Sequence, residues 1–235
     1  MATRTLPAKV ARSKGARGGK GTRKGRGDTR GRIVLAAAEL IHRQGVNATS
    51  LDMVARAAGV NRGSLYYFFR SKKNLARAVI DHFEGLLATH YLKPALEGEG
   101  GGREKIERLA GLYSQMPRLE APCCGCPIGN LSLEVSGQDE ELRVQLAGVW
   151  ERIFGRIEGA LRQARDEGEL PPGADAGALA RAFFSQIQGA HIIARATLDA
   201  AALQRDCRRA FEGLPWIFPT AGTGTDESAP GVRKE

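Results

Sequence analysis

Three cysteines lie within four positions of one another near the middle of the chain. Cys123, Cys124 and Cys126 belong to the segment CCGCPIGNLSLE, which runs on into an apolar pattern of helical period. A thiolate is both a nucleophile and a soft metal ligand. The cluster could therefore bind a metal, form a disulfide, react with an electrophile or fill part of a core.

The spacing of these thiols is a poor match to a metal site. Structural zinc is usually held by CxxC pairs that place four ligands at the corners of a tetrahedron. The only other cysteine, Cys207, follows much later in the chain, and no histidine lies near the cluster in the sequence. The crowding also differs from the spaced disulfide framework of secreted proteins. We therefore expect no metal and no other cofactor.

Reactivity toward electrophiles has a better physical basis at Cys126. Pro127 suits the first position of a helix over PIGNLSLEV, which leaves Cys126 as the N-cap residue. The positive end of the helix dipole would favour the thiolate, which attacks electrophiles and oxidants. Cys123 and Cys124 could resolve an oxidised Cys126 or merely coexist with it. A small buried hydrophobe is the competing interpretation, and the local sequence does not separate the two.

Recognisable catalytic frames do not occur in the sequence, which contains neither an HExxH nor a GxSxG motif. The segment GKGTRKG superficially suggests a phosphate-binding loop. However, Lys20 is followed by Gly21 rather than by serine or threonine, and no strand is predicted before it. We therefore do not expect an enzyme.

Positive charge is concentrated at the N-terminus. Residues 1–32 hold eleven lysines and arginines and one acid, whereas the whole chain has a formal charge of +9. Glycines lie among these charges, so the segment cannot bury enough apolar surface to offset its backbone entropy. We expect residues 1–29 to be a disordered basic arm and residues 219–235 a disordered tail. The arm is either a solvated tail or, as we favour, a contact for nucleic acid.

Membrane insertion and secretion are not expected. No run approaches the roughly 20 apolar residues that a bilayer span needs, and no apolar stretch follows the basic charges as it would in a signal peptide. The sequence therefore predicts a cytoplasmic protein without membrane contact.

Residues 30–69 have the pattern of a helix-turn-helix domain, with apolar residues at three- and four-residue spacing. Such a pair of short helices can place side chains in the major groove of DNA, although similar corners also occur in bundles that bind no DNA. The expected elements are a helix from about Arg30 to Gly45, a second capped by Thr49 or Ser50 and ending at Gly59, and a third capped by Asn61 with Leu65 and Phe69 inward.

The segment TSLDMVARAAGVNRGSLYYFFRSKKNL, residues 49–75, resembles the DNA-binding domain of TetR-family repressors, and the likeness covers residues 31–80. This resemblance implies an all-α homodimer that binds a double-stranded DNA operator. A helix-turn-helix domain, residues 30–75, would precede a ligand-binding and dimerisation domain, residues 76–218. Phe68 departs from the family, many members of which have histidine there. The expected DNA-binding residues are Thr49, Ser50, Asn61, Arg62, Ser64, Tyr66, Tyr67 and Lys72.

Helical patterns continue through the second domain, over residues 139–168, 175–197 and 200–214. In the resembled family, a C-terminal helix pair of this kind packs against its copy in the dimer. We expect an effector pocket lined from residues 112 to 191. Its candidate residues, each of which could instead be core, are Trp150, Phe154, Phe183, Phe184 and His191.

The segment GCPIGNLSLE is also similar to a NemR-like subgroup of TetR-type regulators, in which the cysteine of a Gly-Cys pair responds to electrophiles. The sequence thus predicts a repressor that leaves its operator when a small-molecule or electrophile effector occupies or modifies the second domain. Two alternatives stay open. One is a helical enzyme or small-molecule-binding protein with an incidental helix-turn-helix, and the other is a metal-responsive repressor that uses the cysteine cluster.

Overall fold

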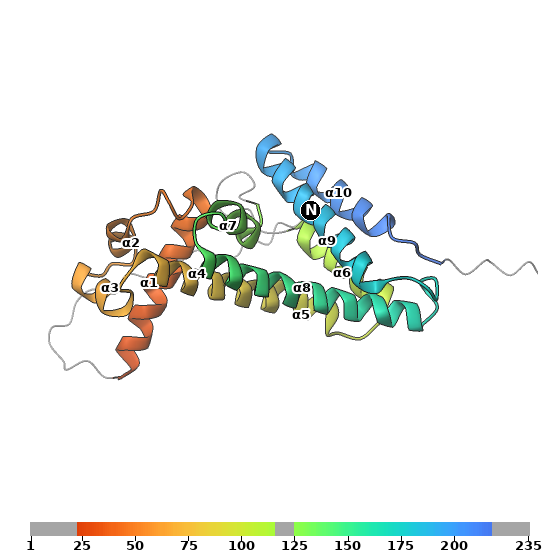
Figure 1. Cartoon of the computed structure of the whole chain (residues 1–235), viewed down its shortest axis with the longest axis horizontal. Coiled ribbons are helices and arrows are strands. Elements are labelled where there is room, and N and C mark those ends of the chain that lie inside the picture. The colour runs from red at the N-terminus through yellow and green to blue at the C-terminus, as the bar shows by residue number, and fades with distance from the viewer. Residues whose placement is uncertain (1–22, 116–124, 218–235) are drawn as a thin grey trace, which may run out of the picture.

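Residues 23–115 and 125–217 are described by a computed structural model, and they form helices joined by short connections (Figure 1). These residues form no strand, so the predicted all-α class is confirmed. None of their helices combines the length and the apolar character that a membrane span requires. The elements are α1 (Arg23–Gln44), α2 (Leu51–Ala57), α3 (Arg62–Phe68), α4 (Lys72–Leu87), the π-helical turn η1 (Ala88–Leu92), α5 (Lys93–Leu96), α6 (Gly102–Ser114), α7 (Pro127–Val135), α8 (Glu140–Asp166), α9 (Ala176–Thr197) and α10 (Ala200–Glu212).

Helices α1, α2 and α3 lie together at one end of the molecule (Figure 1). Ser50, Asn61 and Ser71 cap α2, α3 and α4, because each side chain accepts a hydrogen bond from the backbone amide three residues later. Gly59, in the turn between α2 and α3, has a φ of 63°, which glycine adopts without strain. The predicted helix-turn-helix is therefore confirmed, and we call α1–α3 the reading domain.

One helix boundary differs from the sequence-based expectation. Helix α1 begins at Arg23 rather than near Arg30, so part of the expected arm is helical. Once a helix has formed, each added residue gains a backbone hydrogen bond without a new nucleation cost. Helix α4 is followed directly by η1 and α5, so helical structure continues to Leu96. The π-helical turn changes the helical repeat locally, which side-chain spacing in the sequence does not reveal.

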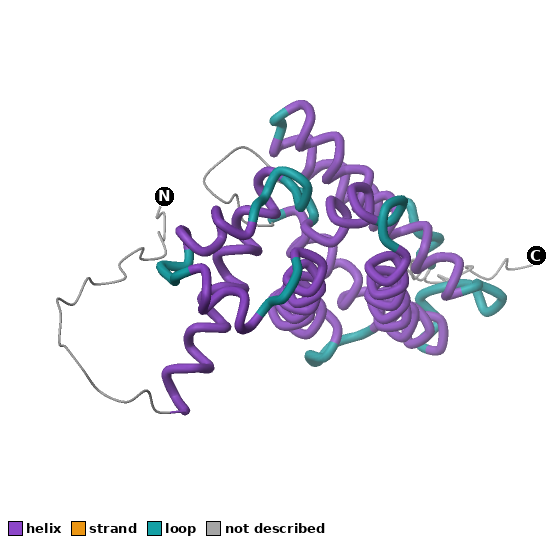
Figure 2. Tube along the Cα trace, turned by 60° about the vertical axis from the view of Figure 1, so that its left-hand side comes forward, coloured by secondary structure: helices purple, strands orange, loops and turns teal. Residues whose placement is uncertain are grey.

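The second domain is a bundle in which α6, α8, α9 and α10 pack on one another. Helix α8 begins at the N-cap residue Asp139 and buries one apolar residue per turn, including Leu146, Val149 and Ile153. Figure 1 shows α4 running beside α8, with which it packs, and Figure 2 shows from another side that helices make up most of the described trace. Helix α4 thus belongs to both parts of the molecule, since it leaves the reading domain and enters the bundle.

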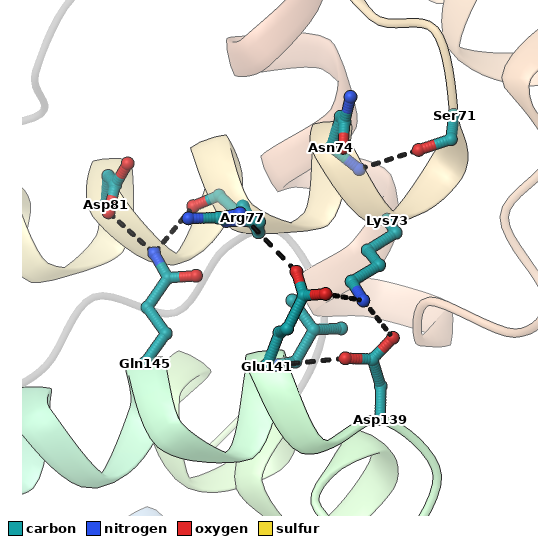
Figure 3. A network of polar contacts seen from close by, with 9 residues as sticks. Ser71, Lys73, Asn74, Arg77, Asp81, Asp139, Glu141 and Gln145 are labelled. Carbon is teal, nitrogen blue, oxygen red and sulfur yellow. Dashed lines mark hydrogen bonds and ion pairs between the residues drawn. The ribbon is translucent and has the colours of Figure 1, made fainter.

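A polar network fastens the start of α8 to α4 (Figure 3). Lys73 Nζ lies 3.1 Å from Asp139 Oδ2 and 2.8 Å from Glu141 Oε1, and Arg77 Nη1 lies 3.5 Å from Glu141 Oε2. Gln145 Nε2 donates a hydrogen bond of 3.1 Å to the backbone carbonyl of Arg77. Ser71 caps the same end of α4, so the network ties α8 to the segment that carries α3.

Candidate DNA-binding surface and effector site

The outer face of α3 is exposed, as its spacing predicted. Leu65 and Phe69 point into the reading domain and are 0% and 3% exposed, whereas Tyr66 and Tyr67 are 39% and 64% exposed. Phe68 is half-buried, and its ring meets that of Tyr67 edge-on at 5.0 Å between centroids. The two tyrosines thus stand on the surface of a short helix of the size that fits a major groove.

Polar groups gather at the N-terminus of α3. Asn61 Oδ1 accepts a 2.7 Å hydrogen bond from the backbone amide of Ser64. The guanidinium of Arg62 lies 5.5 Å from the ring centroid of Tyr66 and 3.5 Å from Asp52 Oδ1. Arg62 and Asn61 are exposed and Ser64 is half-buried. This end of α3 therefore presents both donors and acceptors to solvent.

Thr49 was expected to contact DNA, but the structure places its side chain inside the protein. It is 2% exposed, and its hydroxyl donates a 2.7 Å hydrogen bond to the carbonyl of Gly45. The sequence did not distinguish Thr49 from Ser50 as the cap of α2, but Ser50 fills that position and stays exposed. Lys72 donates a 3.0 Å hydrogen bond to the carbonyl of Asn47. An ammonium has three N–H donors, so this bond leaves Lys72 further donors for a phosphate.

The geometry around Cys126 explains the segment GCPIG. Gly125 has a φ of 76°, a left-handed conformation that favours glycine. Cys126 is the N-cap of α7 and Pro127 its first residue, as predicted. A Cβ on Gly129 would lie 3.0 Å from Oε1 of Gln188 and 3.5 Å from Cβ of Cys126. Glycine at position 129 therefore leaves α7 room to pack against α9 beside the thiol.

Burial contradicts the expectation that Cys126 favours its thiolate. The side chain is 3% exposed, and this burial raises the pKa of the thiol above its ordinary value. The backbone amides of Ile128 and Gly129 and the side chain of Gln188 favour the thiolate, but their effect is smaller than that of burial. The helix N-terminus is thus present as predicted, whereas the solvent access that would activate the sulfur is missing.

Cys123 and Cys124 lie outside the described residues. Cys207 is buried in α10, where burial raises its thiol pKa to about 12. Within the described ranges, no group of three or more histidines, cysteines or acids is arranged to hold a metal ion. The role expected for Cys123 and Cys124 thus stays a prediction.

Helix α7 is hydrogen-bonded to the reading domain near both of its ends. His42 Nε2 in α1 donates a 3.0 Å bond to the carbonyl of Gly125, directly before Cys126. Near the other end, Glu134 accepts bonds of 2.8 and 2.7 Å from the backbone amides of Val46 and Asn47. His42 is buried, and desolvation lowers the pKa of its ring, so the neutral form is favoured. His42 and Glu134 were not among the expected site residues, because their partners lie more than 80 positions away in the sequence.

The expected pocket residues form an aromatic cluster. The ring of Phe184 lies 6.0 Å from Trp150, 6.2 Å from Phe154 and 5.2 Å from Tyr113, measured between centroids. Phe183 and His191 are buried, whereas Trp150 and Phe154 are half-buried. The Trp150 indole donates a 2.9 Å hydrogen bond to Ser132 in α7. The cluster thus connects α8 and α9 to α6, and Trp150 also binds α7.

Three buried polar atoms at the junction of α6, α7 and α9 have no hydrogen-bond partner among the described residues. They are the Tyr113 hydroxyl, Gln188 Nε2 and His191 Nε2. A buried polar group that stays unpaired lowers the stability of the fold by about 1 to 3 kcal/mol. Three such groups close together therefore favour a water molecule or a ligand bound between them. Desolvation lowers the pKa of His191 to about 4. Tyr113 and Gln188 fall within the expected pocket range of residues 112 to 191 but were not among its named candidates, although Gln188 is a polar residue on an apolar face of α9.

Comparisons with known proteins agree with this architecture. Residues 33–79 match a family model described as bacterial regulatory proteins of the tetR family, and residues 102–211 match a tetracyclin repressor-like C-terminal domain. A helix-turn-helix-type transcriptional regulator of Mycobacterium tuberculosis is 30% identical over 176 residues, which cover 73% of this chain and 87% of the relative.

Solved structures give the same result. The regulatory protein TetR from Rhodobacter sphaeroides superposes with a TM-score of 0.72 at 26% identity, covering 80% of this chain and 99% of that one. The reduced form of Escherichia coli NemR superposes with a TM-score of 0.69 at 21% identity, covering 81% and 98%, which shows the shared fold. The matched families and relatives are regulators, so the alternative of a helical enzyme is dropped.

Proposed function

This chain belongs to the TetR family of DNA-binding transcriptional regulators, and from that premise we propose that it is a repressor released from its operator by a small-molecule or electrophile effector. The observation that carries the proposal is the attachment of α7 to the reading domain. Cys126 starts this helix, Gly125 before it is bound by His42, and Glu134 in its last turn binds the loop after α1. A change beside Cys126 can therefore alter how the reading domain is held.

Operator recognition is assigned to α3 and its surroundings. Tyr66, Tyr67 and Arg62 would enter the major groove, and Ser50 and Lys72 would contact phosphates. The basic residues of the N-terminal arm would add contacts to the DNA backbone that do not depend on sequence. Exposure of the two tyrosines and of Arg62 supports this assignment.

A dimer is expected to bind a palindromic operator, because two-fold symmetry of the protein places two reading domains on equivalent half-sites. Apolar side chains exposed near the C-terminal end of α9 support a second copy as the partner. Ile192, Ile193 and Leu198 are 51%, 54% and 58% exposed. Adjacent apolar side chains of this size mark an interaction surface more often than isolated ones do.

The effector is proposed to act at the junction of α6, α7 and α9. An electrophile would react there with the small thiolate fraction of Cys126, so the reaction should be slow at neutral pH and faster at higher pH. The adduct would enlarge a side chain that is 3% exposed, and packed interiors tolerate little added volume. A reversible ligand would shift the same equilibrium if it bound one conformation more tightly than the other.

Fluorescence anisotropy with a labelled palindromic operator, before and after treatment with N-ethylmaleimide, tests the proposal. We expect the parent protein to bind the operator and to be released by the reagent. Cys126→Ser should bind equally well and resist release, because serine can still cap α7 but is not the nucleophile.

Cys207→Ser is the matched control, since it removes another buried thiol, and it should be released like the parent. Cys123→Ser and Cys124→Ser decide between the neighbouring thiols. If Cys126→Ser is released as readily as the parent while either neighbour resists, the wrong sulfur was chosen. Release of all variants alike would refute thiol sensing and leave the reversible ligand.

A further inference from the structure

The junction of α6, α7 and α9 has hydrogen-bonding groups that the described chain leaves unused. Phe184, Gln188 and His191 follow one another at spacings of four and three residues, so they lie along one face of α9. Tyr113 faces them from α6, with its ring 5.2 Å from that of Phe184 and 6.1 Å from that of His191. The Tyr113 hydroxyl, Gln188 Nε2 and His191 Nε2 all lack partners within hydrogen-bond distance among the described residues, and the Gln188 side chain lies close enough to Cys126 to favour its thiolate.

Cys126 borders the same junction. A Cβ on Gly129 would lie 3.0 Å from Gln188 Oε1 and 3.9 Å from the Cys126 sulfur, so Gln188 and the thiol flank the same glycine. A charge on Cys126 would also raise the pKa of the fully buried Tyr113 hydroxyl. The three unpaired polar groups and the thiol therefore surround one region of the interior.

This region is electrically neutral near pH 7. Burial raises the pKa values of Tyr113 and Cys126, and it lowers the pKa of His191 to about 4, so each group is uncharged. A charged ligand would lose its hydration here without meeting an opposite charge on any of these side chains. The junction is therefore suited to a neutral ligand.

The donors and acceptors define the polar part of such a ligand. Tyr113 O–H and Gln188 N–H are donors. The backbone carbonyl of Tyr113 faces the His191 ring and favours its protonation. A ring N–H directed at that carbonyl leaves the lone pair of the neutral imidazole on Nε2. The ligand must therefore offer a carbonyl oxygen to Tyr113 and Gln188 and an adjacent donor to His191.

We propose that this junction binds a small neutral carboxamide, whose carbonyl oxygen accepts from Tyr113 and Gln188 and whose N–H donates to His191 Nε2. Its hydrocarbon part would pack against the ring of Phe184. The inference rests on the proposed function only for its consequence, since binding here would be the event that the regulator senses. The binding itself can be measured without DNA.

The test uses the full-length chain with propionamide as the probe and propionate as its charged counterpart of similar size. Cys126 is modified by methyl methanethiosulfonate, and the extent at each cysteine is read by peptide mass spectrometry. Propionamide at saturating concentration should slow modification of Cys126 at least threefold, and propionate should not. Cys207 reports general effects in the same sample, and its modification should not respond to either compound.

Two tyrosine variants separate hydrogen bonding from packing. Tyr113→Phe should lose the protection, because it removes one donor and keeps the ring. Tyr91→Phe is the matched control, since its ring packs 5.2 Å from that of Tyr113, and it should keep the protection. Gln188→Met gives a second test of the donor set, and thermal unfolding confirms that each variant is folded.

Three outcomes would overturn the proposed carboxamide site. They are no protection of Cys126 by propionamide, equal protection by propionate, and protection that persists in both Tyr113→Phe and Gln188→Met. Ordered water as the sole occupant would give the first of these results. Operator binding is measured on the same samples. Protection of Cys126 without operator binding would support the carboxamide site and count against the regulator proposal. Operator binding and release without protection would support the regulator proposal and count against the carboxamide site.

Discussion

Replacing Glu134 with alanine removes the acceptor of two backbone hydrogen bonds between α7 and the loop after α1. The carboxylate accepts from Val46 N at 2.8 Å and from Asn47 N at 2.7 Å. Hydrogen bonds to a charged group contribute about 1.5 to 3 kcal/mol each when buried. Here one bond is partly buried and the other exposed, so we take about 1.5 kcal/mol for the pair, roughly a tenfold change in an equilibrium constant.

The expected effect depends on which conformation makes these bonds. If α7 holds the reading domain in its operator-binding position, Glu134→Ala should weaken operator binding of the untreated protein about tenfold. In the N-ethylmaleimide-treated protein the proposed mechanism has already displaced α7, so Glu134→Ala should change operator binding little. Fluorescence anisotropy gives the dissociation constant of the treated protein divided by that of the untreated protein. This ratio should therefore fall about tenfold in Glu134→Ala.

Glu140→Ala is the matched control, because Glu140 is an exposed acid in α8 that pairs with Arg143 in its own helix. It should leave the ratio unchanged. If Glu134→Ala also leaves the ratio unchanged, these bonds are made equally in both conformations. In that case α7 does not transmit the effector signal through Glu134, and the route through His42 and Gly125 becomes the remaining contact to test.

Three further outcomes are expected. Tyr67→Ala should weaken operator binding at least about tenfold and change the free energy of unfolding by less than about 0.5 kcal/mol, since Tyr67 is 64% exposed; a folded variant with parental affinity would exclude Tyr67 from the interface. Deleting residues 2–22, which precede α1 and hold six lysines and arginines, should reduce the slope of log affinity against log salt concentration by up to about 5 units, and an unchanged slope would make the arm a bystander. Because the pKa of His191 is lowered to about 4 in the folded chain, the unfolded chain binds the extra proton first, and stability should fall by up to about 3 kcal/mol as pH drops from 6.5 to 4. Urea unfolding of the parent and of His191→Gln checks this, and an equally steep loss in both would assign it to other groups such as His42.

Local features of the fold could be predicted from the sequence. Ser50, as one of two candidates, and Asn61 were expected to cap the second and third helices and do so, and Asp139, at the start of the expected helical pattern over 139–168, caps α8. The expected helix over 175–197 is observed as Ala176–Thr197. Leu65 and Phe69 were separated from Tyr66 by helical spacing alone. These features depend on residues within one or two turns of each other, where capping and amphipathic spacing act.

Properties that depend on distant segments could not be predicted. The N-cap position of Cys126 follows from Pro127, but its burial depends on how α7 packs into the bundle. The bond between His42 and Gly125 joins residues 83 positions apart. In both cases nearby residues determine the backbone conformation, whereas contacts with distant segments determine the surroundings of the side chain.

The attachment of α4 to α8 makes α4 a stiff lever between the bundle and α3. Sixteen residues of α-helix are about 24 Å long, and Lys73 lies at the end that carries the reading domain. A tilt of about 5° around the far end would move α3 by about 2 Å. In the proposed dimer, two protomers tilting in opposite directions would change the distance between the two α3 helices by about 4 Å, more than the 3.4 Å rise of one base-pair step. Small rotations of one helix would therefore be sufficient to put the two halves of the proposed dimer one base pair out of register with its operator.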